Sequence, residues 1–522
     1  MKKTVFIKNA AVLTVTSILM RLIGIFFKIW LGRAVGAEGI GLYQLIFSVY
    51  MLASTFASAG IITAVTRLVA DELALGCRAG IVKILRRCLE LTLLIALLST
   101  AVLFFGADFI AGVLLSDGRA APAVRVLSLV LPFMGTASVL RGYFIARRNA
   151  APSALSQLLE QTVRIALVVV LLKKYLPFGL SKACAAVLFA DIAAHAAAVA
   201  YLWLRYTCDK ARLPESSGRK SPPFGVVRAI LHISAPITAG RYLNTALRTA
   251  ENLLVPRGLE QNGGGENALS QFGMIKGMAL PVLFFPSSLL GAISTMLIPE
   301  ISEAAARGRR GLVRGATERI IQLTSLVSFI FAAIFLTAGR QIGGLLFESE
   351  SVGRLLCALS PIVPLMYLDS VCDGILKGLD QQSFCFKTGL ADSGLRILLV
   401  LAVLPRFGMT GFLGIMYFSN ILTCFLNVGR LLKVSGAKIK AVSWILLPLA
   451  AALCITLTVS RVLLLLDFSP VLYAALLCLI SCPLYAAVLF LTGCVCRDDI
   501  ADITGSKSKG KKRGAGRAGR TV

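Results

Sequence analysis

Histidine and acidic residues are scarce in this chain, and their scarcity excludes several kinds of site. The 522 residues include two histidines, His195 and His232, and 26 Asp and Glu against 54 Lys and Arg. Two histidines are too few for a zinc site, and the thirteen cysteines show no metal-binding or disulfide spacing. A Walker motif is absent, as is any catalytic set of side chains. We therefore expect neither an enzyme nor a protein with a metal or nucleotide cofactor.

Charged residues of both signs together make up only 15% of the chain, whereas 57% of it is hydrophobic. The mean hydropathy is +0.82, and apolar runs long enough to cross a bilayer recur along nearly the whole length. These values predict an all-α polytopic membrane protein. The net charge of +28 would suggest a nucleic-acid partner in a soluble protein. Here the positive-inside rule explains most of that charge, so no nucleic acid is expected.

The sequence predicts fourteen transmembrane spans joined by short connections. They lie at about 9–31, 41–63, 88–110, 123–145, 155–173, 179–203, 229–252, 270–298, 319–339, 355–377, 387–404, 410–431, 442–464 and 471–493. The first span is too long and too charged to be a signal peptide. Lys and Arg concentrate in the segments on the N-terminal side, which predicts that both termini lie in the cytoplasm.

The first span carries two charges that a membrane helix should lack. Arg21 and Lys28 lie seven residues apart, about two helical turns, so they project from one face of the helix. Thr14 and Ser17 extend that face. A cation in the middle of a bilayer costs from about 2.5 to more than about 10 kcal/mol. This polar stripe therefore predicts a helix that faces a water-filled cavity and not lipid.

An internal repeat relates the two halves of the chain. A shift of 232 residues superposes the fourth and fifth spans on the tenth and eleventh without a gap, and a shift of 229 superposes the sixth span on the twelfth. The matched positions include Pro132 with Pro364, Gly142 with Gly374, Glu160 with Asp392, Arg164 with Arg396, and Asp191 with Asn420. A shift of 220 then places Arg21 on Arg241 and Lys28 on Arg248, so the seventh span carries the same cationic stripe.

The repeat also predicts the domain organisation. The predicted parts are an N-terminal six-helix repeat (1–204), a cytoplasmic linker (205–228), a C-terminal six-helix repeat (229–433), two additional helices (434–496) and a disordered basic tail (497–522). Because six is even, both repeats enter the membrane from the same side, and the substrate path should lie between them. The tail is low in complexity and should bind anionic lipid headgroups.

Two segments of the chain resemble a known family. The stretches from Gly36 to Glu72 and from Lys276 to Ala304 are similar to the stage V sporulation protein B family. That family belongs to the polysaccharide-transporter branch of the multidrug/oligosaccharidyl-lipid/polysaccharide exporter superfamily. The resemblance implies a V-shaped pair of six-helix bundles around a central cavity that opens to either side in turn. Relatives with fourteen helices include the lipid II flippases, in which cavity arginines engage the diphosphate and the last two helices help to hold the polyprenyl tail.

We therefore expect an anion site lined by Arg21, Lys28, Arg241 and Arg248, with Lys276 extending it. Arg side chains bind phosphate oxygens in a forked geometry, and Lys acts as a point charge. The alternative for Lys28, Arg248 and Lys276 is that each side chain extends to the membrane interface.

The acidic residues within the spans are assigned two roles. Asp373 and Asp392 are candidates for Na⁺ or H⁺ coupling, and no other cofactor is expected. The i,i+4 pairs Glu160–Arg164 and Asp392–Arg396 are expected to neutralise each other as structure. Asp373 falls on Arg141 in the other repeat, so these two side chains are candidates for a pair across the repeats.

The predicted function is that of a monomeric flippase for an undecaprenyl-diphosphate-linked sugar. Its substrate would be lipid II or a polysaccharide repeat unit, and its role cell-wall, spore-cortex or polysaccharide synthesis. A first alternative is a cation-coupled multidrug efflux transporter, although its cavity should offer carboxylates and aromatic rings. The second is a membrane scaffold that recruits cell-wall enzymes.

Overall fold

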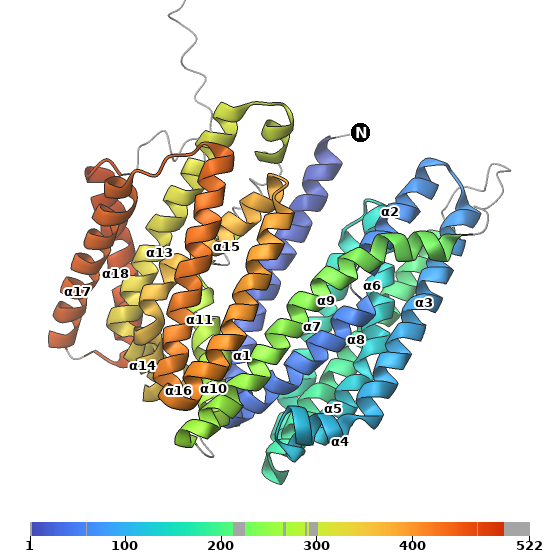
Figure 1. Ribbon diagram of the computed structural model, residues 1–522, viewed down its shortest axis with the longest axis horizontal. Coiled ribbons are helices and arrows are strands. Elements are labelled where there is room, and N and C mark those ends of the chain that lie inside the picture. The colour runs from blue at the N-terminus through green and yellow to red at the C-terminus, as the bar shows by residue number, and fades with distance from the viewer. Residues whose placement is uncertain are drawn as a thin grey trace, which may run out of the picture.

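The computed structural model describes residues 3–58, 60–211, 225–264, 268–287, 290–291, 301–466 and 468–494 (Figure 1). For residues 3–14, 17, 57, 180, 181 and 264 this description covers the backbone alone. Most of the predicted linker, the whole predicted tail, and the side chains of Thr14 and Ser17 thus lie outside it.

The described residues fold almost entirely into helices. The N-terminal half contains α1 (Lys3–Ser58), α2 (Ile61–Ala74), α3 (Arg78–Phe105), α4 (Ala107–Phe109), η1 (Ile110–Leu114), η2 (Gly118–Ala120), α5 (Ala121–Ser128), α6 (Val130–Ala146), α7 (Ala151–Tyr175), η3 (Leu176–Phe178) and α8 (Leu180–Ala211). The C-terminal half contains α9 (Val226–Leu259), η4 (Glu260–Gly264), α10 (Ala268–Phe272), η6 (Gly273–Ala279), α11 (Leu280–Phe284), α13 (Arg310–Phe347), α14 (Glu350–Leu359), η7 (Ser360–Ile362), α15 (Val363–Gly378), α16 (Gln382–Ser435), η8 (Val442–Leu446), α17 (Leu447–Leu465) and α18 (Pro470–Leu491).

These helices account for the fourteen predicted membrane spans. Ten helical stretches of the described chain are long and apolar enough to cross a membrane. Two of them hold two spans each, because the backbone turns at Gly36 (φ 72°) inside α1 and at Gly408 (φ 53°) inside α16. The seventh and eighth spans are α9 and the shorter apolar stretch Ala268–Phe284. The all-α polytopic fold with two six-helix repeats and two additional helices is thereby confirmed.

Two glycines matched by the repeat lie at equivalent turns. Gly179, before α8, has a φ of 103°, and Gly408, which the 229-residue shift places on it, also has a positive φ. Positive φ is a region that glycine adopts without steric cost. The repeated Phe-Gly sequence therefore marks the same reversal of the chain in both halves.

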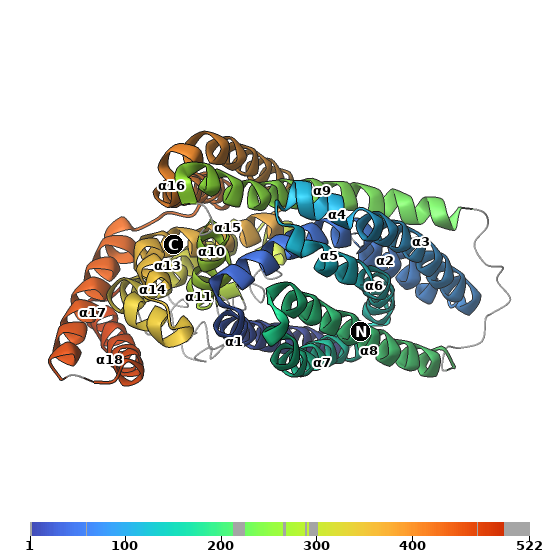
Figure 2. The same ribbon diagram turned by 90° about the horizontal axis from the view of Figure 1, so that it is seen from below.

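The helices form two bundles with α1 and α9 between them. We call α1–α8 the N-lobe and α9–α16 the C-lobe; α17 and α18 lie at the outer edge of the C-lobe in both views (Figures 1 and 2). Helix α1 packs on α6 and α7 of its own lobe and on η6 and α9 of the other. Helix α9 packs on α16 of its own lobe and on α2 and α3 of the other. Both helices therefore contact both lobes.

The last two helices pack against α13 through their own buried cluster. Tyr485 of α18 donates a hydrogen bond to the Leu326 carbonyl (3.1 Å), and Gln322 donates to the Cys494 carbonyl (2.7 Å). Much of the surface of α17 and α18 remains apolar and exposed, including Leu465 and Leu479. These helices are therefore anchored to α13 along one side and leave a broad apolar face on the other.

A buried ion network holds α6, α7 and α8 together. It consists of Arg141, Glu160, Arg164, Asp191 and His195, and we call it the N-lobe network. Glu160 accepts from Arg141 (2.7 Å) and Arg164 (3.0 Å), and Arg164 also pairs with Asp191. The His195 Nε2 atom lies 3.5 Å from Glu160. The predicted Glu160–Arg164 pair is confirmed, and two arginines balance two carboxylates, as a structural role requires.

Two arginines join the lobes at the end of the molecule where α4, α5 and α10 lie, the lower end in Figure 1, which we call the closed end. Arg33 of α1 donates to the carbonyls of Leu345 and Leu346 at the last turn of α13, the latter at 2.5 Å. The last carbonyls of a helix have no partner within it and carry its negative dipole end, so a guanidinium is well suited to them.

The second arginine makes the equivalent contact in the opposite direction, from the C-lobe to the N-lobe. Arg257 of α9 donates to the carbonyls of Val113 and Leu114 at the end of η1 (3.1 Å to Leu114) and to Ser116 Oγ (3.0 Å). A shift of 232 residues places Val113 and Leu114 on Leu345 and Leu346. Each lobe thus sends an arginine from its central helix to the equivalent helix end of the other lobe. We call these two contacts the arginine latches.

We expect the double variant Arg33→Ala/Arg257→Ala to open more readily at the closed end. A hydrogen bond to a charged group contributes about 1.5–3 kcal/mol, so each lost latch should shift the opening equilibrium about tenfold or more. Hydrogen exchange followed by mass spectrometry should then be faster in peptides covering 110–116 and 343–348. Arg354→Ala is the control, because Arg354 bonds only Ser351 of its own helix. Equal exchange in the double variant and the wild type would contradict the latches.

We also expect Arg164→Ala to lower the thermal unfolding midpoint strongly in detergent. The substitution leaves Asp191 buried without its cation, and breaking a buried pair in this way costs about 3–5 kcal/mol. Arg86→Ala is the matched control, because Arg86 pairs with Glu90 on an exposed helix face, where such pairs contribute about 0–1 kcal/mol. Similar midpoints for the two variants would show that the N-lobe network is not a structural element.

Candidate anion-binding site

Four predicted site residues, Arg21, Lys28, Arg241 and Arg248, lie on the two central helices, and we call them the stripe cations. Arg21, Arg241 and Arg248 are exposed, and Lys28 is partly buried. Within the described part of the chain, none of the four charged groups has a hydrogen-bond or ion-pair partner. No described side chain therefore neutralises these four charges.

Other cations within the helices are treated differently. Arg141 and Arg164 belong to the N-lobe network, and both Lys276 and Arg396 pair with a carboxylate in the C-lobe. Pairing makes an intramembrane charge tolerable, and these four cations are paired, whereas the stripe cations have no partner among the described residues.

Some polar side chains of α9 pack against α1, and others are exposed. Thr245 Oγ1 lies 3.4 Å from Thr55 Oγ1, and Asn252 donates to Ser48 Oγ (3.0 Å), so these two side chains bind the second half of α1. Arg241 and Arg248 of the same predicted stripe remain exposed. Thr245 and Asn252 therefore join α9 to α1, whereas Arg241 and Arg248 do not.

Arg21 reaches from α1 to the C-lobe. A methyl group added at Gly291, in the segment that follows α11, would lie 3.0 Å from Arg21 Nη1. The guanidinium of an N-lobe helix thus lies against the eighth predicted span. Arg21 thus lies between the two lobes, where a site built by both repeats is expected.

Lys276, the fifth predicted residue, is paired. Its Nζ lies 3.1 Å from Glu251 Oε1, and Arg396 Nη2 approaches the same oxygen to 2.5 Å. Sequence reasoning missed Glu251, although a carboxylate three residues after Arg248 in an apolar helix is a visible signal. We call Glu251, Lys276 and Arg396 the C-lobe network. Arg248 lies within electrostatic range of Lys276.

The two candidate coupling carboxylates have separate surroundings. Asp392 accepts a hydrogen bond from Ser419 (2.6 Å), with Arg248 and Arg396 in electrostatic range. Asp373 pairs with Lys377 (2.5 Å) at the partly exposed side of α15. Asp392 and Asp373 therefore bond different side chains.

Two predicted ion pairs are wrong. Asp373 does not bond Arg141, since the Arg141 guanidinium is held by Glu160 and Ser156 within the N-lobe. Arg396 does not bond Asp392 one turn before it, because its guanidinium is directed to Glu251 on α9. Both errors arise because the choice of partner depends on which distant helix lies opposite.

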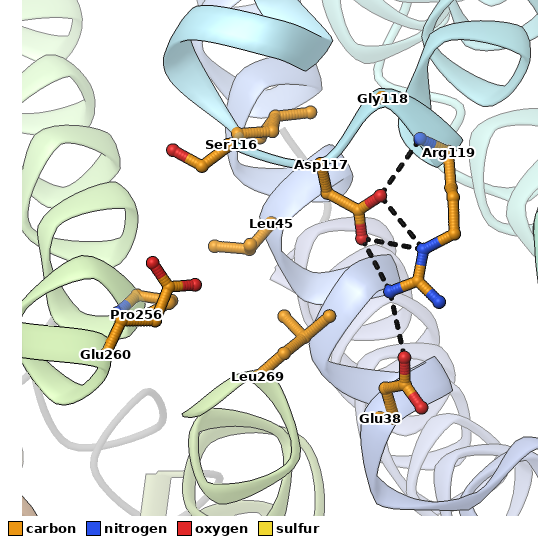
Figure 3. A pocket seen from close by; sticks show the side chains of 10 residues that line it. Glu38, Leu45, Ser116, Asp117, Gly118, Arg119, Pro256, Glu260 and Leu269 are labelled. Carbon is orange, nitrogen blue, oxygen red and sulfur yellow. Dashed lines mark hydrogen bonds and ion pairs between the residues drawn. The ribbon is translucent and has the colours of Figure 1, made fainter. Parts of the chain in front are cut away.

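A cavity of about 540 Å³ lies at the closed end, between the lobes (Figure 3). Its charged lining is formed by Glu38, Asp117, Arg119 and Glu260, and Arg119 bonds both Glu38 and Asp117 at 2.8 Å. Three carboxylates against one guanidinium disfavour an anion. The cavity contains none of the predicted site residues and is distinct from the stripe cations.

Comparison with known proteins identifies the family. A family model described as polysaccharide biosynthesis protein matches residues 6–305. The chain is 27% identical over 445 residues to stage V sporulation protein B of Bacillus subtilis (strain 168), covering 84% of this chain and 86% of that protein. It is 24% identical over 410 residues to lipid II flippase MurJ of the same organism, covering 72% and 73%.

Among solved structures, the fold is similar to lipid II flippase MurJ in an inward closed conformation, with a TM-score of 0.69 at 13% identity, covering 93% of this chain and 99% of that one. The expected resemblance to the stage V sporulation protein B group is confirmed. This multi-pass membrane protein belongs to the polysaccharide biosynthesis protein family.

Proposed function

We propose that the protein is a flippase that moves an undecaprenyl-diphosphate-linked sugar across the bacterial plasma membrane by alternating access. The observation that carries this proposal is the presence, on the two helices between the lobes, of four cations without a partner among the described residues. A lipid diphosphate is anionic, is too polar to cross a bilayer unaided, and offers oxygens that arginine forks bind well. The names of the relatives, a sporulation protein and a lipid II flippase, support the same class of substrate.

In this proposal the headgroup enters from the cytoplasmic side and binds the stripe cations. The closed end then faces outward, and the arginine latches hold it shut until the lobes rock apart. The sugar is lipid II or a polysaccharide repeat unit, for cell-wall, spore-cortex or polysaccharide synthesis. The polyprenyl tail remains in lipid along α17 and α18, whose exposed apolar face suits it.

The driving force is proposed to be an ion gradient or the membrane potential, which supplies about 2.3 kcal/mol per charge per 100 mV. Asp392 is better placed than Asp373 to couple a cation to the site, because Arg248 lies within its electrostatic range. Na⁺ and H⁺ remain the two candidates, and both termini are placed in the cytoplasm. The proposed unit is a monomer whose basic tail binds anionic headgroups.

The rival functions predict different side chains and different mutational outcomes. A multidrug transporter needs carboxylates and aromatic rings to hold cationic drugs, whereas the stripe residues carry the opposite charge. A scaffold for cell-wall enzymes would depend on its tail and would tolerate loss of Arg21 or Arg241.

We expect Arg21→Gln and Arg241→Gln each to reduce translocation of lipid II by about tenfold or more, because each removes a charge-assisted contact of about 1.5–3 kcal/mol to phosphate. The measurement is the initial rate of lipid II translocation in proteoliposomes that contain the purified full chain. Arg86→Gln, on an exposed face of α3, is the control and should leave the rate unchanged.

Comparable defects in both variants are expected from a site that both repeats build. Unchanged rates in both would exclude the proposed anion site. Wild-type transport of cationic drugs with no translocation of any lipid diphosphate would favour the multidrug alternative.

A further inference from the structure

The C-lobe network concentrates two cations on one carboxylate oxygen. Glu251 is buried on α9, and its Oε1 atom accepts from Lys276 of η6 (3.1 Å) and Arg396 of α16 (2.5 Å). Helices α9 and α16 pack side by side along one edge of the molecule in Figure 2, so this contact joins two neighbouring helices of the C-lobe. Arg248, a stripe cation, lies one helical turn before Glu251 on the same helix.

The repeat shows that this arrangement is particular to the C-lobe. Arg164, the N-lobe counterpart of Arg396, is held within its own bundle by Glu160, Gln161 and Asp191. In the C-lobe, Asn420 replaces Asp191 and donates instead to the Met416 carbonyl.

The remaining two partners are also lost in the C-lobe. Ser393 falls on Gln161 and is shorter, and Asp392 falls on Glu160 but accepts from Ser419. Arg396 has therefore lost all three local partners and turns to the central helix.

The charges that meet at Glu251 do not balance. Lys276 and Arg396 contribute two positive charges against its one negative charge, and Arg248 lies within electrostatic range of Lys276. Asp392 and Asp369 lie nearby, and neither accepts a bond from Lys276 or Arg396 in the described chain. In addition, the buried Arg396 Nε has no hydrogen-bond partner among the described residues. The N-lobe network, with two arginines and two carboxylates, has no such excess when His195 is neutral. The C-lobe therefore has both spare positive charge and a spare donor beside a stripe cation.

We propose that Glu251 is an internal competitor for the anion of the substrate. Its carboxylate holds Lys276 and Arg396 when the site is empty, and the diphosphate displaces it from both cations on binding beside Arg248. Carboxylate and phosphate oxygens accept from the same ammonium and guanidinium donors, so the two cannot bind them fully at once. Glu251 thereby weakens binding enough for the headgroup to leave at the other face. This inference rests on the proposed function and extends its site to Arg396.

The test measures diphosphate binding to the purified full chain in nanodiscs, by calorimetry and by the thermal unfolding midpoint. Inorganic diphosphate is the probe, and undecaprenyl diphosphate and undecaprenol are the competitors. We expect Glu251→Gln to bind the probe about tenfold or more tightly than the wild type. We also expect its midpoint to fall without the probe, because two cations lose their partner, and to recover when the probe binds.

Glu160→Gln is the matched control. Glu160 also accepts from two arginines, but within the N-lobe network. Its loss should lower the midpoint with no gain in affinity and no recovery by diphosphate. If Glu251→Gln does not fold, Glu251→Gln/Lys276→Gln keeps the local charge unchanged, and it should bind the probe more tightly than Lys276→Gln alone. Adding Arg396→Gln to Glu251→Gln should abolish the gain.

The outcomes separate this inference from the function on which it rests. A wild type that binds diphosphate, with Glu251→Gln no tighter or its midpoint not recovered, would reduce Glu251 to a structural ion-pair partner and leave the flippase proposal intact. If no variant binds diphosphate and Arg241→Gln leaves translocation unchanged, both proposals fail. Displacement of the probe by undecaprenyl diphosphate but not by undecaprenol supports the lipid headgroup as ligand, and no displacement by either rejects it.

Discussion

A charge within a membrane must be paired or must reach water, because a bare cation there costs at least about 2.5 kcal/mol. The arrangement of this protein depends on that constraint. The N-lobe and C-lobe networks satisfy it by pairing, and in doing so they tie helices together. The stripe cations lack partners among the described residues and lie on α1 and α9, the helices that contact both lobes. The helices between the lobes thus carry cations without a partner among the described residues, and a polar headgroup would pass along these helices.

The two repeats have the same scaffold but have diverged in their polar side chains. Gly179 and Gly408 turn the chain at equivalent places, and the arginine latches use equivalent helix ends. The buried arginines nevertheless have different partners, because an aspartate in the N-lobe is Asn420 in the C-lobe. One lobe therefore has a charge-balanced structural network, and the other directs a cation toward the central helix. The two lobes therefore share a backbone arrangement but differ in the distribution of their buried charges.

The arginine latches join the two lobes at the closed end. Each arginine latch joins a central helix of one lobe to a helix terminus of the other, where carbonyl groups lack partners of their own. Such contacts are short-range and directional, so a small rotation of the lobes breaks both together. In the acidic cavity beside the latches, Arg119 bridges Glu38 and Asp117, so this cavity does not favour an anion.

The sequence by itself determined the helical class, the number of spans, the repeat, and the cationic stripe on the first and seventh helices. The length of an apolar run and its helical periodicity are local properties, so the sequence alone predicts them. The tertiary structure decided which charges are paired. From the sequence, Lys276 is a candidate free cation and Arg396 a candidate partner of Asp392, whereas in the structure both pair with Glu251 on α9. An ion pair depends on distances between helices far apart in sequence, and in the C-lobe three local partners of the arginine differ at once, so no local pattern could reveal the partner.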